Sequence, residues 1–244
     1  MRIIYFSPHL DDAVLSAGGL IRSQVDAGIP VEIWTFMAGI PGDSALSEFA
    51  KKMHGKWGFN SGQQAVESRR LEDREATAQV GAKCVQFDFL DCLYRCDRLG
   101  RPMYSDVELP IHSDDVDLAA QIAQTMIAWV DPDDTLVCQL AVGGHVDHVI
   151  VRQAAEMLRR PLTYDVDLPY LLDHPEELEP STFGLRESLQ PISEPSFRCW
   201  ITAIECYRSQ IGAVFGSHEL MHQRMHDFWL DQRGIQFWTR QTSG

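Results

Sequence analysis

Residues 2–12 read RIIYFSPHLDD, and this stretch decides the fold class. Its first five residues are β-formers and nearly all apolar, which predicts a buried strand of a parallel sheet. Residues 13–19 are small or apolar and open a helix. One imidazole and two carboxylates therefore stand where the strand ends, at the sheet edge where open α/β sheets bind their ligands.

The following residues complete a β-α-β unit. Residues 13–27 carry apolar side chains at helical spacing up to Gly28, and residues 31–36 form a second predicted strand. A crossover of this kind is right-handed and makes the two strands parallel. The G-x-G-x-x-G turn is missing between strand and helix, which argues against a dinucleotide site. We therefore predict an α/β, Rossmann-like, mostly parallel sheet flanked by helices.

The rest of the chain continues the alternation of strands and helices. Further strands are predicted at residues 84–87, 135–138 and 162–164, with a possible edge strand at 235–239. Helices are predicted at 65–80, from Asp114 or Asp115 to 129, and at 149–158, 199–215 and 217–232. Two segments, 37–63 and the proline-rich 165–197, are expected to be long irregular walls at the carboxyl edge.

The composition is that of one globular domain. The 244 residues are 45% hydrophobic and 23% charged, and we expect a single domain with a core at 1–165 and C-terminal additions at 166–244. The net charge of −14 disfavours nucleic acid and anionic membranes as partners. No apolar run approaches ~20 residues, so we expect a cytoplasmic protein, with a homo-oligomer as an open alternative. The cysteines are expected to be mostly buried thiols, although Cys92 and Cys96 are close enough in sequence to pair or to bind a metal.

A second cluster of ligand-type residues follows another predicted strand. Residues 143–148 read GGHVDH and come after the apolar run at 135–138. A catalytic zinc ion typically has three protein ligands drawn from histidine and carboxylate and leaves a fourth position to water. His9, Asp12 and His148 would provide such a set.

The remaining polar residues of the two clusters have roles in the same scheme. Asp11 is expected to take a proton from water, and protonated His145 to stabilise charge on the attacked oxygen. Asp147 is expected to accept a hydrogen bond from a histidine. The alternative for Asp11 or Asp12 is that it caps the following helix.

Four segments resemble the LmbE-like, or PIG-L, family of zinc-dependent N-acetyl-sugar deacetylases. They are SPHLDD at 7–12, RRLED at 69–73, GGHVDH at 143–148 and AIECYRSQ at 203–210. The resemblance covers nearly the whole chain. It implies a Rossmann-like fold, one divalent metal ion, usually Zn²⁺, and removal of an acyl group from an N-acetylglucosamine-type sugar or conjugate, with release of acetate. Leu10 and Ala13 stand where many members have proline and glutamate, which leaves the substrate open.

The resemblance also implies two substrate-binding residues. Arg69 lies in the segment similar to the family's R-x-x-E helix, and Asp91 matches a position that contacts a sugar hydroxyl. The local pattern leaves an alternative for each of them. Arg69 and Glu72, one helical turn apart, would form a solvated ion pair, and Asp91 would form a turn.

A competing metal motif lies near the C-terminus. Residues 218–222 read HELMH and match the H-E-x-x-H pattern, in which His218 and His222 bind zinc and Glu219 is the base of a peptidase. His226 extends the row of imidazoles, but no glutamate follows Glu219 to complete the usual ligand set. A non-catalytic sugar-binding module is the other alternative. The spare aspartate and histidine beside the first metal set favour an enzyme.

Overall fold

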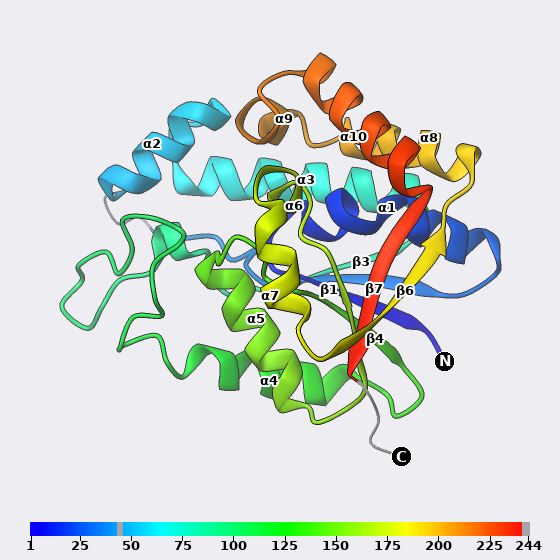
Figure 1. Cartoon of the computed structure of the whole chain (residues 1–244). Helices are drawn as coiled ribbons and strands as arrows, with labels where there is room; N and C mark the ends of the chain where they lie inside the picture. The colour runs from blue at the N-terminus through cyan, green and yellow to red at the C-terminus, as the bar shows by residue number, and fades with distance from the viewer. Residues whose placement is uncertain (43–45, 241–244) are drawn as a thin grey trace.

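The computed structural model describes residues 1–42 and 46–240. They form a seven-stranded sheet with the strand order β3-β2-β1-β4-β5-β7-β6 (Figure 1). The parallel strands are β1 (Ile3–Ser7), β2 (Val31–Thr35), β3 (Lys83–Gln86), β4 (Thr135–Gln139) and β5 (Leu162–Asp165). An antiparallel pair, β6 (Leu185–Pro191) and β7 (Gly234–Arg240), extends the sheet beyond β5.

Helices cover both faces of this sheet (Figure 1). One face carries α1 (Asp12–Asp26), α3 (Gly62–Val80) and α8 (Glu194–Ile204), which pack on one another. The other face carries α4 (Leu118–Trp129) and α5 (Val146–Met157). Strands β1, β2 and β4 are buried along nearly their whole length, as expected for strands covered on both sides. The predicted single-domain α/β class with a mostly parallel sheet is confirmed.

The contact between α1 and α8 depends on a glycine. A Cβ atom at Gly18 would lie 2.4 Å from the ring of Trp200. That ring is fully buried, and its indole N–H donates a hydrogen bond to the carbonyl of Val14 at 2.6 Å. Because no side chain separates them, α8 packs directly on the helix that starts at the metal-type motif.

The segment 37–63 differs from the expected irregular wall. It contains the helix α2 (Glu48–Trp57), and α3 already begins at Gly62. The Ser47 hydroxyl accepts a hydrogen bond from Ala50 N–H at the start of α2, and Gly58 ends the helix in the left-handed conformation. The apolar residues at 49, 50, 53 and 57 have helical spacing, so the sequence did carry a signal for this helix, which the prediction of an irregular segment overlooked. Residues 43–45 of the expected loop lie outside the described residues.

The C-terminal third also differs from the prediction. The single helix expected at 199–215 is two helices, α8 and α9 (Arg208–Val214), separated by a break at 205–207. The phenol of Tyr207 is buried at that break and donates a hydrogen bond to Asp73, a contact outside the reach of local periodicity. The helix expected at 217–232 is confirmed as α10 (His218–Gln232).

The proline-rich segment 165–197, expected to be an irregular wall, contains short helices and also a strand that was missed. The short helices are α6 (Tyr170–Asp173), η2 (Pro175–Glu177) and α7 (Leu178–Thr182). β6 is mostly exposed and lacks an apolar alternation, so only its pairing with β7 reveals it. β7, expected as an edge strand, lies inside the sheet between β5 and β6.

Two of the misplaced helix starts concern polar side chains. The helix expected from residue 114 or 115 begins at Leu118, and the carboxylate of Asp115 binds Arg95 instead of capping it. The helix expected at 149–158 begins at Val146, so the last three residues of the GGHVDH segment stand in its first turn. Among the helices of the described ranges, we find none with the length and apolar character needed to cross a bilayer.

Candidate metal centre

The two clusters meet because their strands are neighbours. β1 and β4 pair in parallel, so the residues after their carboxyl ends lie at the same edge of the sheet. His9 comes from the turn between β1 and α1, Asp12 is the first residue of α1, and His148 comes from the first turn of α5. All three side chains are at least nine-tenths buried.

One carboxylate oxygen joins the two imidazoles. Asp12 Oδ2 lies 3.1 Å from His9 Nδ1 and 3.3 Å from His148 Nε2. The rings of these histidines are 5.2 Å apart between centroids. The structure thus brings together the three residues predicted as metal ligands. Asp12 does not act as a simple helix cap, because its side chain faces the histidines.

The outward-facing nitrogen of each imidazole is bonded to a second buried carboxylate. His9 Nε2 lies 3.0 Å from Asp147 Oδ2, and His148 Nδ1 lies 2.8 Å from Asp167 Oδ1. Such carboxylates fix the orientation of a metal-binding histidine and make its free nitrogen more basic. The pattern leaves His9 Nδ1 and His148 Nε2 as the nitrogens available to an ion.

A divalent cation fits this cluster on several grounds. His9, His145 and His148 offer ring nitrogens that lie within 4.8 Å of one another. His148 Nε2 is buried and has no hydrogen-bond partner, a state that bound metal would relieve. Imidazoles with a carboxylate are also the ligand set of zinc and related transition metals.

Asp11 stands beside the cluster and is held by Arg69. Arg69 Nη2 lies 3.5 Å from Asp11 Oδ1, and its Nη1 lies 4.0 Å from Asp91 Oδ2. Burial raises the pKa of Asp11 to about 6, although the charge of Arg69 opposes the shift. A carboxylate with a raised pKa next to a metal-type cluster is suited to accept a proton near neutral pH.

The surroundings shift the pKa values of the neighbouring Asp11 and Asp12 in opposite directions. Burial also opposes ionisation of Asp12, but the charges of His148 and His9 and the hydrogen bond from His9 outweigh it and hold the pKa of Asp12 well below its usual value. Burial lowers the pKa of His9, yet its bonds to Asp12 and Asp147 raise it well above the ordinary value. Asp12 is therefore the ionised partner of the histidines, and Asp11 is the carboxylate that can take up a proton.

His145 differs from the protonated form expected from the sequence. Burial and the charges of His9 and His148 hold the pKa of His145 well below its usual value, so the ring is neutral. The backbone N–H of Asp147 donates to His145 Nδ1 at 3.1 Å. The ring proton therefore stands on Nε2, and His145 is a neutral hydrogen-bond donor in the wall of the cavity.

These residues line a cavity of about 380 Å³. Its floor holds His9, Asp11 and Asp12, and its walls include Arg69, Asp91 and His145. Tyr170, Gln210 and one face of α2 also line it. All the predicted site residues except the buried Asp147 and His148 thus face one concave space.

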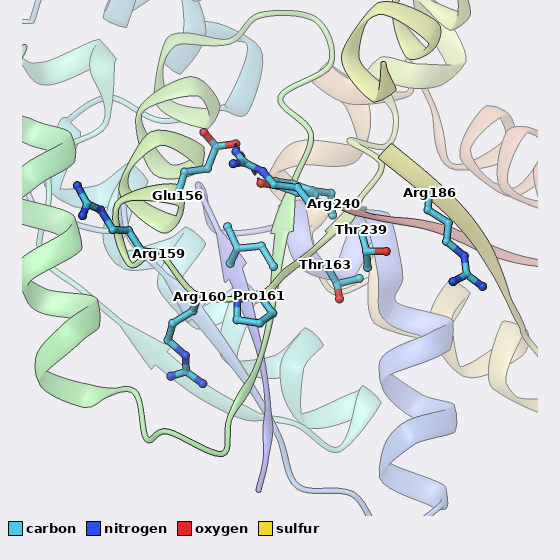
Figure 2. A pocket seen from close by; sticks show the side chains of 10 residues that line it. Glu156, Arg159, Arg160, Pro161, Thr163, Arg186, Thr239 and Arg240 are labelled. Atoms are coloured by element: carbon cyan, nitrogen blue, oxygen red, sulfur yellow. Dashed lines mark hydrogen bonds and ion pairs between the residues drawn. The ribbon is translucent and has the colours of Figure 1, made fainter. Parts of the chain in front are cut away.

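A larger cavity, of about 780 Å³, lies elsewhere, beside the start of β5 and the end of β7 (Figure 2). It is lined by several arginines and by none of the predicted site residues. Arg159, Arg160 and Arg186 point in different directions in Figure 2, so their guanidinium groups do not converge on one ligand. The smaller cavity is therefore the candidate site.

The two remaining family-like segments pack against each other. Glu72 accepts hydrogen bonds from the backbone N–H of Ser209 at 3.0 Å and from its hydroxyl at 2.6 Å. Asp73 accepts a hydrogen bond from Tyr207 at 3.1 Å. Glu72 is thus bonded to Ser209, and the solvated Arg69–Glu72 pair considered above is not formed. The contact holds α9 beside the cavity, which Gln210 lines.

Several residues of the site were missed by the sequence analysis. Arg95 lies in a loop and forms an ion pair with Asp147, a contact that nothing in the local pattern indicates. Asp167 follows β5 in the way that Asp11 follows β1, so the same signal of an acid after a strand could have found it. Tyr170 packs over Gly143, where a Cβ atom would lie 2.8 Å from its ring.

The other candidate ligands do not form a comparable site. His218, Glu219 and His222 are exposed on α10, and His222 Nε2 lies 2.9 Å from Glu205. None of the possible metal clusters among the described residues contains them. Cys92 and Cys96 are both free thiols, although Cys92 is buried next to His145 and Asp147.

Residues 4–158 match the family model described as PIG-L: GlcNAc-PI de-N-acetylase. The chain belongs to the PIG-L family. This PIG-L protein is 25% identical to a probable N-acetyl-alpha-D-glucosaminyl L-malate deacetylase 2 of Bacillus cereus, over 97% of the chain and 96% of that protein. It is 23% identical to the 2'-N-acetylparomamine deacetylase of Niallia circulans, over 96% of the chain and 92% of that protein.

Two solved structures similar to this PIG-L protein are deacetylases. The zinc-inhibited form of the teicoplanin deacetylase Orf2 is 27% identical, with a TM-score of 0.82 and 100% of both chains covered. The A40926 pseudoaglycone deacetylase Dbv21 is 29% identical, with a TM-score of 0.77 and coverage of 98% and 96%. The family predicted from four short segments is confirmed, and the names of these relatives support the predicted enzyme class, an N-deacetylase.

Proposed function

We propose that this PIG-L protein hydrolyses the acetamide of an N-acetylglucosamine-type sugar conjugate, with His9, Asp12 and His148 as ligands of a divalent metal ion. The observation that carries the proposal is the arrangement around Asp12 Oδ2. Two imidazole nitrogens face this oxygen, and the other nitrogen of each ring is tied to a buried carboxylate. Zn²⁺ is the proposed ion, because the set combines two imidazoles with a carboxylate.

In this proposal the chain's own residues move the protons. When bound, the ion acts as a Lewis acid and makes a neighbouring water more acidic. Asp11 accepts the proton of the attacking water, and the Nε2–H of His145 donates a hydrogen bond to the oxygen that becomes negative on the acyl carbon. The proton held by Asp11 then passes to the departing amine, so that one water and one amide give acetate and a free amino sugar.

The sugar is positioned by the polar walls of the cavity. Asp91 would accept a hydrogen bond from a sugar hydroxyl, and Arg69 would hold both Asp91 and Asp11 in place, as the distances of 4.0 Å and 3.5 Å suggest. Asp147 serves as the carboxylate behind His9 and does not contact the substrate, because its side chain is fully buried.

The experiment measures acetate and free amine released by the zinc-loaded protein. N-acetylglucosaminyl L-malate and 2'-N-acetylparomamine are suitable first substrates, because relatives are named for them. We expect equal amounts of acetate and amine from at least one N-acetylated amino sugar. Metal-loaded protein that releases no acetate across a panel of such conjugates would contradict the proposal.

The proposed location is the cytoplasm. All six cysteines are free thiols, including the exposed Cys96, which suits a reducing compartment. Fractionation of the host cell tests this proposal, and recovery of the protein outside the cytoplasmic fraction would contradict it.

A further inference from the structure

Lysine is rare in this protein and is concentrated beside the site. The chain has a net charge of −14, and three of its four lysines, Lys51, Lys52 and Lys56, fall within the ten residues of α2. Its other basic residues are arginines, apart from Lys83 in β3. A basic helix in an acidic protein calls for a local explanation.

The faces of α2 have different surroundings. Ala50 and His54 are buried, and His54 Nε2 lies 2.8 Å from the hydroxyl of Tyr94, which anchors the helix to the domain. Lys51 binds Glu48 on the same helix at 2.7 Å and is absent from the cavity lining. Phe49, Lys52, Met53, Lys56 and Trp57 line the candidate cavity. Their spacing of three or four residues puts them on a single helical face.

Lys52 and Lys56 are the unpaired cations of this cavity. Arg69, the third basic residue in the lining, is held by Asp11 and Asp91. Neither lysine forms an ion pair with a carboxylate of the described residues, whereas Lys51 and Lys83 each bind a glutamate. Asp173, an acid of the same lining, is bonded to Arg224 at 2.6 Å. Two ammonium groups one turn apart are thus free to bind a ligand.

We propose that α2 is the specificity element of the site and that Lys52 and Lys56 bind an anionic group, a carboxylate or a phosphate, on the part of the conjugate attached to the amino sugar. Phe49, Met53 and Trp57 contact the apolar atoms next to that group. Trp57 is fixed for this role, because the guanidinium of Arg69 lies over its ring at 4.8 Å. The inference rests on the proposed function, since it assumes that the sugar occupies the floor of the same cavity.

The alternative is that these lysines only keep the surface soluble. That role suits Lys51, which faces away from the cavity and already has a partner on its own helix. It does not explain why two lysines share a face with three apolar side chains at the mouth of a site. The floor of the cavity is rich in carboxylates, so an anionic substrate needs compensating positive charge on its way in.

The test compares paired substrates that differ only in charge. N-acetylglucosaminides with an aglycone that ends in a carboxylate or a phosphate are compared with neutral analogues. In these analogues a methyl amide replaces the carboxylate, and a hydroxyl group replaces the phosphate. We expect the wild type to prefer the anionic member of at least one pair, and the K52Q/K56Q variant to lose about tenfold or more in kcat/KM for that member, mainly through KM. The loss on the neutral analogue is smaller, and the preference weakens as salt is added. K51Q, a matched change on the same helix, keeps the wild-type preference.

The two arms identify the anion. A larger loss on the phosphate conjugate assigns the lysines to a phosphate, and a larger loss on the carboxylate conjugate assigns them to a carboxylate. Equal losses on charged and neutral substrates, or a wild type that prefers neither member of any pair, would overturn the inference.

Binding of the deacetylated conjugates separates this inference from the proposed function. These conjugates are free amines, and calorimetry measures their affinity for the protein without any turnover. If no acetate is released from any substrate, the proposed function fails, while a charge-dependent affinity that is lost in K52Q/K56Q still supports the lysine site. Amine affinities that do not depend on the anionic group would contradict the lysine site even if the enzyme is active.

Discussion

Arg95 Nη2 lies 2.6 Å from Asp147 Oδ1, and both side chains are buried. Arg95 also binds Asp115 through its Nε atom at 2.8 Å, while Asp147 binds His9. A buried chain of charges therefore runs from an irregular loop to the candidate metal ligand. Burial and the charge of Arg95 act in opposite directions on the pKa of Asp147, and the result is a pKa far below the usual value.

Arg95→Gln is expected to destabilise the protein by about 3–5 kcal/mol, because it leaves Asp147 and Asp115 as buried carboxylates without their partner. The free energy of unfolding in urea measures the loss. Arg98→Gln is the matched control, since Arg98 is exposed and lies 3.6 Å from Asp114 in an ion pair that contributes ~0–1 kcal/mol. Equal stability of the two variants would show that Asp147 does not depend on Arg95.

His148→Ala is expected to abolish metal binding, because it removes one of the two imidazoles that face Asp12 Oδ2. Elemental analysis of protein dialysed against zinc measures the ion content. His218→Ala serves as the control and should keep a full equivalent of metal. The reverse result, with metal lost in His218→Ala and kept in His148→Ala, would make the motif on α10 the metal site.

Asp11→Asn is expected to keep the metal and to lower kcat by ~10²- to 10⁴-fold, the usual contribution of a general base. The amide has nearly the shape of the carboxylate but cannot take a proton from water. Acetate release and metal content are measured on the same sample. Full activity of Asp11→Asn would remove Asp11 from its proposed role.

Asp167→Asn is expected to weaken metal binding by ~10- to 100-fold, because the carboxylate behind His148 orients the ring and raises its basicity. Competition with a chelator of known affinity gives the dissociation constant. Asp173→Asn is a suitable control, since Asp173 lines the cavity and binds Arg224 but touches neither histidine. An unchanged dissociation constant for Asp167→Asn would mean that packing alone fixes His148.

Two glycine substitutions in helices should change the free energy of unfolding in opposite directions. Gly18→Ala is expected to destabilise, because the new Cβ atom would lie 2.4 Å from a buried tryptophan ring. Gly55→Ala should stabilise by about 0.5–1 kcal/mol, because nothing lies within 4 Å and alanine favours the helix. Thermal or urea unfolding compares both variants with the wild type. A stabilised Gly18→Ala variant would show that α8 shifts freely against α1.

Local patterns were sufficient for the elements that carry the metal motif. β1 and β4 are short apolar runs that end in polar ligand-type residues, and the following helices have regular apolar spacing. The motif, the helical period and the parallel crossover all lie within short stretches of chain. For this reason His9, Asp12 and His148 could be expected together before any coordinates were known.

Elements without a local signal were missed or misplaced. β6 has no apolar alternation and does not differ in pattern from a loop. α2 has only two buried side chains, and its short apolar period at 49, 53 and 57 was overlooked among the glycines around it. The break between α8 and α9 depends on Tyr207, whose partner Asp73 lies far away in the sequence. Such elements owe their form to contacts made only after the chain has folded.

The sequence by itself determined the fold class, the family and the residues of the two clusters, because hydrophobic periodicity and short motifs are properties of neighbouring residues. Only the tertiary structure decided which carboxylate stands behind which histidine, that Arg95 neutralises Asp147, and that two lysines of α2 face the cavity. The physical reason is that hydrogen bonds and ion pairs act over a few ångströms between side chains that the sheet order brings together, and no local pattern encodes those distances.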